Sequence, residues 1–184
     1  LDIFPSTITT WGAWQKTHPE TMIISAASLG QDADQINDPY SSYYLSPIPG
    51  ISGADINDNR LPSKTLVVGL FADNHARAFP FEQVKTEGII NDQIATTPIV
   101  LLYDSTLQSS VAYRSALKDK FLRFEKTNQI GLIRDRETGS LWEIRTGKAI
   151  QGPLSGTVLT RINAPLVFWF AWANHYPNTE VYNH

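Results

Sequence analysis

The sequence contains no cysteine, which excludes disulfide bonds, thiolate nucleophiles and cysteine-ligated metals within this chain. It also lacks an excess of charge, because a net charge of -3 over 184 residues provides no basic surface for nucleic-acid phosphates. The longest hydrophobic run, residues 166–173, is less than half a membrane span. The 42% of hydrophobic and 18% of charged residues are typical of a folded soluble protein, so we expect neither a nucleic-acid partner nor a transmembrane segment.

Turn signals are densest between residues 131 and 156, where they alternate with short apolar runs. The acidic and hydroxyl residues before Gly139 can bond their own backbone, and Gly139 itself tolerates a positive φ. This spacing is typical of a β-meander and predicts successive strands joined by tight turns. The structural signature residues of this segment are Asp135, Arg136, Gly139, Trp142, Gly152 and Gly156.

Further short strands are predicted along the rest of the chain, together with two short helices. The helices are expected at residues 11–18, capped by Thr9 or Thr10, and from Pro165 to the residues before Pro177. Strands are expected at 21–25, 65–71, 76–80, 88–91, 98–103, 110–113, 121–125 and 157–162. This pattern predicts a mainly β fold, a barrel- or sandwich-like meander of short strands with tryptophan-containing helices packed on it.

An internal repeat links the two ends of the chain. Five identities recur 158 residues apart, and four of the ten residues are tryptophans: Trp11, Ala13, Trp14, Pro19 and Thr21 match Trp169, Ala171, Trp172, Pro177 and Thr179. We therefore interpret residues 1–25 as the tail of an upstream repeat unit, 26–63 as a long loop or linker, and 64–184 as a β-rich domain. The chain begins with Leu1 rather than Met, and we expect it to be part of a longer tandem protein, or its tail to exchange between neighbouring copies.

Several of these segments resemble one family. The stretches DRETGSLW, GKAIQGPLSG, FWFAWANHYPNTEVY, DNRLPSKTLVVGLFADNHARAFPF and IINDQIATTPIVLLYD are similar to the prokaryotic domain-of-unknown-function family numbered 3179 over residues 8–25 and 58–184. The resemblance implies an exported, extracytoplasmic protein, often with two related units, in a family with no established activity. It also implies a Cys-Pro-x-Cys-Gly segment in the better-known unit, where this chain has Asp104-Ser105-Thr106-Leu107-Gln108. The chain thus resembles a cysteine-less second unit, and the cysteine chemistry does not carry over.

The sequence offers no catalytic or cofactor-binding constellation. Asp135 and Glu137 flank Arg136 and could do acid–base work, although turn formation and a local ion pair explain them equally well. The four histidines show no metal-binding spacing. A calcium loop of the EF-hand type is excluded, because Arg60 and Leu66 replace the required Gly and Glu. A looser calcium site is a weak candidate, with the ligands Asp55, Asn57, Asp58 and Asn59, or alternatively Asp32, Asp34 and Asp38.

Three tyrosines, Tyr40, Tyr43 and Tyr44, either stack on a ligand or partner or hold the long loop onto the domain, and we favour the second interpretation. For function we expect a non-catalytic extracytoplasmic module for assembly or ligand binding, with an upstream repeat unit or copies of itself as partners. The alternative is an accessory half of a metal- or thiol-dependent redox protein or enzyme whose reactive residues lie upstream. Catalysis by this chain alone is the less favoured reading.

Overall fold

The computed structural model describes residues 5–25, 27–30, 38–50, 58–117 and 120–183. The strands are β1 Leu66–Ala72, β2 His75–Pro80, β3 Ile89–Ile94, β4 Thr97–Asp104, β5 Ser109–Arg114, β6 Ala116–Leu117, β7 Lys120–Phe121, β8 Phe124–Lys126, β9 Leu132–Asp135, β10 Leu141–Glu143, β11 Ala149–Gln151, β12 Arg161–Ile162, β13 Leu166–Phe168 and β14 Glu180–Val181. The helices are α1 Trp11–Thr17, the 3-10 helix η1 Ala27–Leu29, α2 Ser41–Leu45, α3 Phe81–Glu87 and α4 Trp169–His175.

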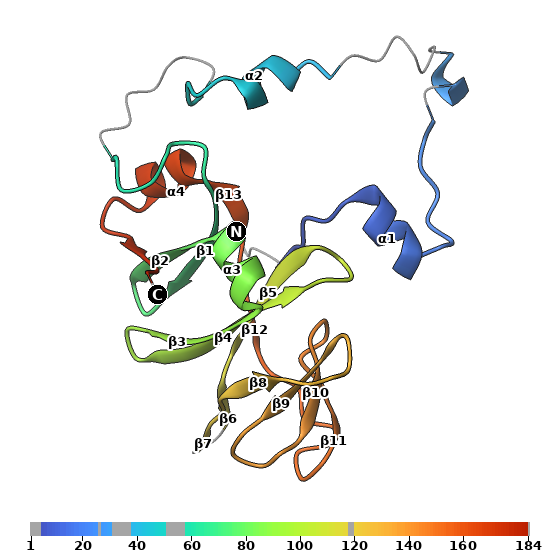
Figure 1. Ribbon diagram of the computed structural model, residues 1–184, viewed down its shortest axis with the longest axis vertical. Helices are drawn as coiled ribbons and strands as arrows, with labels where there is room; N and C mark the ends of the chain where they lie inside the picture. The colour runs from blue at the N-terminus through green and yellow to red at the C-terminus, as the bar shows by residue number, and fades with distance from the viewer. Residues whose placement is uncertain (1–4, 26, 31–37, 51–57, 118–119, 184) are drawn as a thin grey trace.

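These strands form three four-stranded sheets and one two-stranded ribbon (Figure 1). The sheet orders are β13-β1-β2-β14, β12-β5-β4-β3 and β11-β10-β9-β8, and β6 pairs with β7. The predicted mainly β fold with short helices is confirmed. The described strands make several small sheets and do not close into a barrel.

The β1–β2 hairpin forms where the sequence predicts it. Its two turn residues, Asp73 and Asn74, have φ values of 48° and 60°, the left-handed geometry of the two-residue turns that match strand twist. Ala72 faces His75 across the turn, and the ladder continues to Val67 opposite Pro80. The hairpin is the scaffold on which the C-terminal helix rests.

The predicted helix from Pro165 is wrong in its first turn. Residues 166–168 instead form β13, which pairs antiparallel with β1, and the helix begins at Trp169. The apolar run that suggested one helix is therefore an edge strand followed by a seven-residue helix. Hydrophobic periodicity cannot distinguish a strand from a helix in this segment, because the run is short and hydrophobic on both faces. Helix α3 was not predicted from the sequence. Only one of its seven residues, Val84, is buried, so the helix has little hydrophobic periodicity.

The predicted strand at residues 21–25 is also wrong for the described part of the chain. These residues follow α1 but form no ladder, because no described strand lies beside them. Within the 26–63 stretch, the described residues include η1 and the five-residue helix α2.

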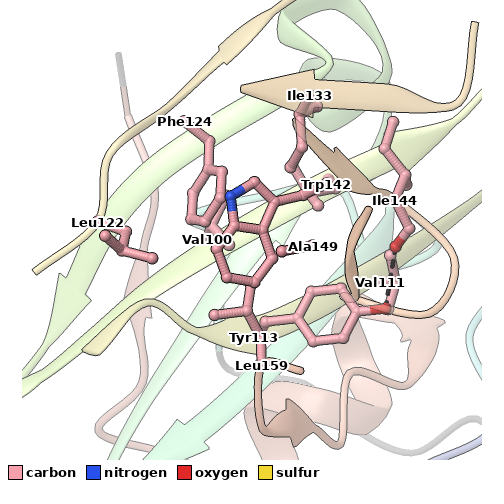
Figure 2. Close-up of a cluster of buried hydrophobic side chains, with 11 residues drawn as sticks. Val100, Val111, Tyr113, Leu122, Phe124, Ile133, Trp142, Ile144, Ala149 and Leu159 are labelled. Atoms are coloured by element: carbon pink, nitrogen blue, oxygen red, sulfur yellow. Dashed lines mark hydrogen bonds between the residues drawn. The ribbon is translucent and has the colours of Figure 1, made fainter. Parts of the chain in front are cut away.

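Three hydrophobic clusters hold the sheets together. The first surrounds Trp142, whose indole stands edge-on to the ring of Phe124 with centroids 5.8 Å apart (Figure 2). In the same cluster, the Tyr113 hydroxyl donates to the carbonyl of Ile144 at 2.9 Å. A second cluster lies between β1, β2, β3, β4 and α3, and a third lies between the β1–β2 hairpin and α4.

Candidate functional site: the Asp135 turn and the N-terminal arm

The carboxylate of Asp135 is fully buried at the end of β9 and saturated with donors. One oxygen accepts the backbone N–H of Thr138 at 2.6 Å. The other accepts the backbone N–H of Ser140 at 3.1 Å and the indole N–H of Trp142 at 2.8 Å. The Thr138 hydroxyl lies 2.9 Å from both oxygens. Asp135 therefore fixes the turn and anchors the central tryptophan of the core, leaving no free acceptor for proton transfer.

The two residues that follow Asp135 lie in different surroundings from it. Arg136 pairs at the surface with Glu125, at 3.1 Å between Nε and Oε2. Glu137 accepts the backbone N–H of Arg123 at 2.8 Å. The two carboxylates of the proposed acid–base pair, Asp135 and Glu137, thus bond to separate partners, and the arrangement supports the turn interpretation.

The glycines of this region complete the same turn system. Gly152 has a φ of 97°, and a Cβ there would lie 2.7 Å from the Cα of Ser140. The Ser140 hydroxyl in turn accepts the backbone N–H of Leu154 at 3.0 Å. Gly139 and Gly156 occupy further turns with positive φ. The 131–156 segment is therefore a structural unit packed around Asp135 and Trp142.

The turn between β4 and β5 contains residues 104–108, where the family resemblance implies a cysteine segment in related units. Asp104 is buried, and its Oδ1 accepts the backbone N–H groups of Thr106 at 2.8 Å and Leu107 at 3.2 Å. Arg145 lies 3.6 Å from the other oxygen. The hydroxyl of Thr9 donates to the carbonyl of Leu107, so the chain before α1 crosses this turn. Asp104 thus caps a tight turn.

The calcium candidates are only partly covered by the structure. Four of them lie outside the described residues: Asp32, Asp34, Asp55 and Asn57. Asp58 pairs with Arg60, whose hydrogen bond lowers the pKa of the Asp58 carboxyl, and it also accepts the Arg60 backbone N–H at 3.1 Å. Asn59 follows and is exposed. Across the described residues no three acidic or histidine side chains converge as a metal site, and the calcium site stays a prediction.

The tyrosines of the long loop contact the domain. The Tyr43 ring lies 6.4 Å from that of Phe168, and the Lys64 ammonium sits 3.6 Å from the centre of the Tyr43 ring. Lys64 also donates to the carbonyls of Tyr43 and Ser46. Tyr40 and Tyr44 keep more than half of their surface exposed. These contacts favour the anchoring interpretation for Tyr43.

Six exposed large apolar side chains lie close together in the sequence within residues 8–24, which we call the N-terminal arm. Its counterpart 158 residues later is residues 166–182, which we call the closing element because it covers one face of the β1–β2 hairpin. In both, an indole N–H donates to the threonine hydroxyl seven positions later: Trp14 to Thr21 at 3.0 Å, and Trp172 to Thr179 at 2.8 Å.

The helix ends of the arm and the closing element also agree. His18 has φ and ψ of -136° and 65°, and Tyr176 has -124° and 77°. Both donate their backbone N–H to the carbonyl of the second tryptophan, at 2.9 and 2.8 Å. The rings of His18 and Trp14 stack with centroids 3.8 Å apart, and those of Tyr176 and Trp172 lie 4.4 Å apart. The two segments therefore have the same local structure.

Their burial is opposite. Trp169 and Trp172 expose 0% and 6% of their surface, whereas Trp11 and Trp14 expose 40% and 36%. Figure 1 shows α4 against the sheet of β1 and β2, while α1 stands apart from the sheets. The expectation that both tryptophan pairs pack onto a sheet holds for α4 only. For α1 it is wrong within the described structure, because no described sheet lies beneath it.

The residues after α1 extend the exposed surface. Met22, Ile23 and Ile24 expose 93%, 61% and 78% of their surface. Their counterparts run through β14, where Val181 pairs with Ala78 in a parallel ladder. The sequence indicated the repeat but could not show this contrast, because burial depends on what lies beside each copy.

Two open grooves accompany these features. One, of about 650 Å³, runs beside α4 and is lined by apolar and aromatic side chains including Phe71, Val167 and Tyr176. The other, of about 530 Å³, lies between β3 and the residues around Phe121.

No helix in the described residues is both long and apolar enough to cross a membrane.

Comparison with known proteins identifies a family. A family model described as a protein of unknown function (DUF3179) matches residues 1–179, nearly the whole chain. No curated protein and no solved structure matches this chain. The resemblance seen in the sequence is thereby confirmed, and the chain belongs to the DUF3179 family.

Proposed function

We propose that this chain is a non-catalytic, extracytoplasmic β-rich module whose role is assembly, with the N-terminal arm as its contact surface. The observation that carries the proposal is the exposure of Trp11, Trp14 and Met22 to Ile24 in a segment whose structural counterpart is buried. Exposed apolar side chains concentrated in one segment are typical of protein interaction sites. Trp is also the residue type most enriched at interaction hot spots.

The candidate catalytic residues support the same choice. Asp135 is buried and bonded to backbone donors of its own turn. Arg136 and Glu137 make surface contacts that an ordinary turn would make. A site that does chemistry needs groups with unused acceptors or donors facing a substrate, and these residues do not offer them.

The native state of the protein tests assembly. We expect the polypeptide purified from its source either to be larger than 20.6 kDa, with a second unit in the same chain, or to be a stable oligomer. Intact mass, terminal sequencing and sedimentation velocity measure both properties. A native product of 184 residues that is strictly monomeric and free of ligand would contradict the proposal. Cell fractionation tests the extracytoplasmic location, which rests on the family resemblance.

A surface variant sharpens this test. In the full chain, Trp14→Ala combined with Ile23→Asp should weaken the association, because it removes apolar area from the arm. Phe121→Ala is the matched control, since Phe121 is 67% exposed and lies far from the arm in sequence. If both variants behave alike, the contact surface lies elsewhere.

The alternative is an accessory half of a metal- or thiol-dependent redox protein. The observation in its favour is that Thr9, near the start of the arm, contacts the turn that stands where the family resemblance places a cysteine segment. A second, cysteine-bearing unit joined through the arm would then be held near this turn. Metal and thiol analysis of the native full-length protein tests it, and a protein without bound metal or thiol-dependent activity would exclude it.

A further inference from the structure

The closing element shows what its counterpart needs in order to be buried. Gly69 in β1 lies directly beneath the Trp172 indole, and a Cβ at that position would come within 2.2 Å of the ring. The indole can therefore pack against the hairpin because residue 69 has no side chain. β14 then adds to the free edge of β2 as a parallel strand, with Glu180 opposite Arg77.

Two arginines fasten the closing element to the rest of the unit. Arg77 pairs with Glu180, and its Nη1 also lies 2.6 Å from Asp92 on β3. Arg60 donates to the carbonyls of Thr179 and Pro177 in the loop between α4 and β14, and its guanidinium lies 5.0 Å from the centre of the Trp169 ring. The docked state thus combines a tryptophan pocket, a strand addition and cation contacts to one loop.

The helix of the arm and the loop after it have the same local geometry as the matching parts of the closing element in its docked state. The Trp14–Thr21 hydrogen bond holds the loop after α1 as the Trp172–Thr179 bond holds the loop after α4. Ile23 stands in the position of Val181 and is 61% exposed. A segment pre-ordered in its bound conformation loses little conformational entropy on docking, which favours association.

Building on the assembly function, we propose that the arm docks onto the β-hairpin of a second unit of this same fold, as the closing element docks onto β1–β2. Trp14 lies over a glycine of the partner's first strand, and residues 22–23 add to the edge of its second strand in parallel. The partner unit lacks a closing element of its own. This chain's hairpin cannot be that partner, because Trp172 and β14 already occupy it.

Differences between arm and closing element describe the partner's chemistry. Met22 replaces Glu180, so the partner has no need of an arginine at the position of Arg77. Gln15 replaces Ala173, which is 4% exposed, so the partner surface offers the Gln15 amide more room and a hydrogen-bond group there. The partner hairpin is therefore a related sequence and differs from β1–β2 at these two places.

A graft within the full chain tests whether the arm can close a hairpin of this fold. Residues 169–181 are replaced by the sequence of residues 11–23, with Ala173 retained because the present hairpin has no place for the glutamine. We expect a cooperatively folding protein with far-UV circular dichroism like that of the parent and a Tm lowered by about 5–15 °C. The matched control is the same graft carrying Trp172→Ala, which should lose the cooperative transition. Loss of the transition in both grafts would overturn the inference.

A second measurement does not depend on the graft folding. Met22 is the one methionine of the chain and is 93% exposed, so a photoactivatable methionine analogue places a cross-linker at this position. In the native full-length protein, we expect the peptide that contains residue 22 to cross-link to the second strand of a glycine-bearing hairpin in another family unit. Cross-links confined to residues 58–183, or to an unrelated protein, would refute this partner.

The outcomes separate this inference from the assembly function. If the native protein associates through the arm but both the graft and the cross-link fail, assembly stands and this docking mode is wrong. If the graft folds but the native product is a lone monomer, the assembly function and the proposed partner are both wrong, and only the structural equivalence of the two segments survives.

Discussion

Replacing Trp172 and Trp14 by alanine, one at a time, tests the contrast between the two tryptophan segments most directly. Both residues sit in the same local structure and make the same indole–threonine hydrogen bond. They differ in burial, at 6% exposed for Trp172 and 36% for Trp14. A difference in stability loss between the two variants therefore measures tertiary packing. Helix propensity and the indole–threonine hydrogen bond affect both variants alike.

The expected cost of Trp172→Ala is large because the indole fills the space above Gly69 and contacts the third hydrophobic cluster. Removing a buried tryptophan costs about 3–5 kcal/mol, which for a protein of this size lowers Tm by about 6–20 °C. Trp14→Ala in the isolated chain should cost about 1 kcal/mol or less, since Trp14 is 36% exposed and its ring stacks on that of the neighbouring His18.

Guanidinium unfolding followed by far-UV circular dichroism is the suitable assay, because it does not depend on tryptophan emission. Unchanged m-values would show that both variants unfold from the same compact state. A stable Trp172→Ala protein with an unchanged midpoint would refute the placement of this residue. Equal losses in the two variants would show that α1 is packed as firmly as α4.

Three further predictions follow from individual contacts. Gly69→Ala should destabilise the protein by about 2–4 kcal/mol through the clash with Trp172, and thermal melts should show that the cost shrinks when Trp172→Ala is also present. Asp135→Asn should cost about 2–4 kcal/mol in urea titrations, because the asparagine NH2 group cannot accept and must face either the N–H of Thr138 or the N–H groups of Ser140 and Trp142, and a neutral result would contradict the proposed anchor. Burial raises the pKa of Tyr113 to about 12. The folded state then holds the Tyr113 proton more tightly than the unfolded chain does. The protonated hydroxyl therefore makes its full contribution to the free energy of unfolding below about pH 10, and this contribution is lost as the pH rises to about 12. We expect Tm to fall between about pH 10 and 12, and Tyr113→Phe should make this fall smaller. The substitution Tyr40→Phe, at an exposed tyrosine, should leave the fall unchanged.

Local chemistry explains the features that the sequence predicted well. The hairpin at β1–β2 depends on Asp73 and Asn74, two residues that tolerate positive φ, between alternating apolar runs. The turn at Asp135 depends on side chains that bond to backbone groups three and five residues away. Helix α1 is capped by Thr10, one of the two predicted caps, whose hydroxyl accepts the N–H of Ala13. Each of these contacts joins neighbours in the sequence, so the residues involved are visible together.

The structure decided those features that depend on distant partners. Residues 166–168 became a strand because β1 offers them a ladder, and residues 21–25 formed no strand because no described neighbour does. The sequence could show that two tryptophan segments are alike, since side chains and their spacing suffice for that. Only the tertiary structure could show that one lies over Gly69 and the other is exposed, because burial is a property of the neighbours that the fold brings together.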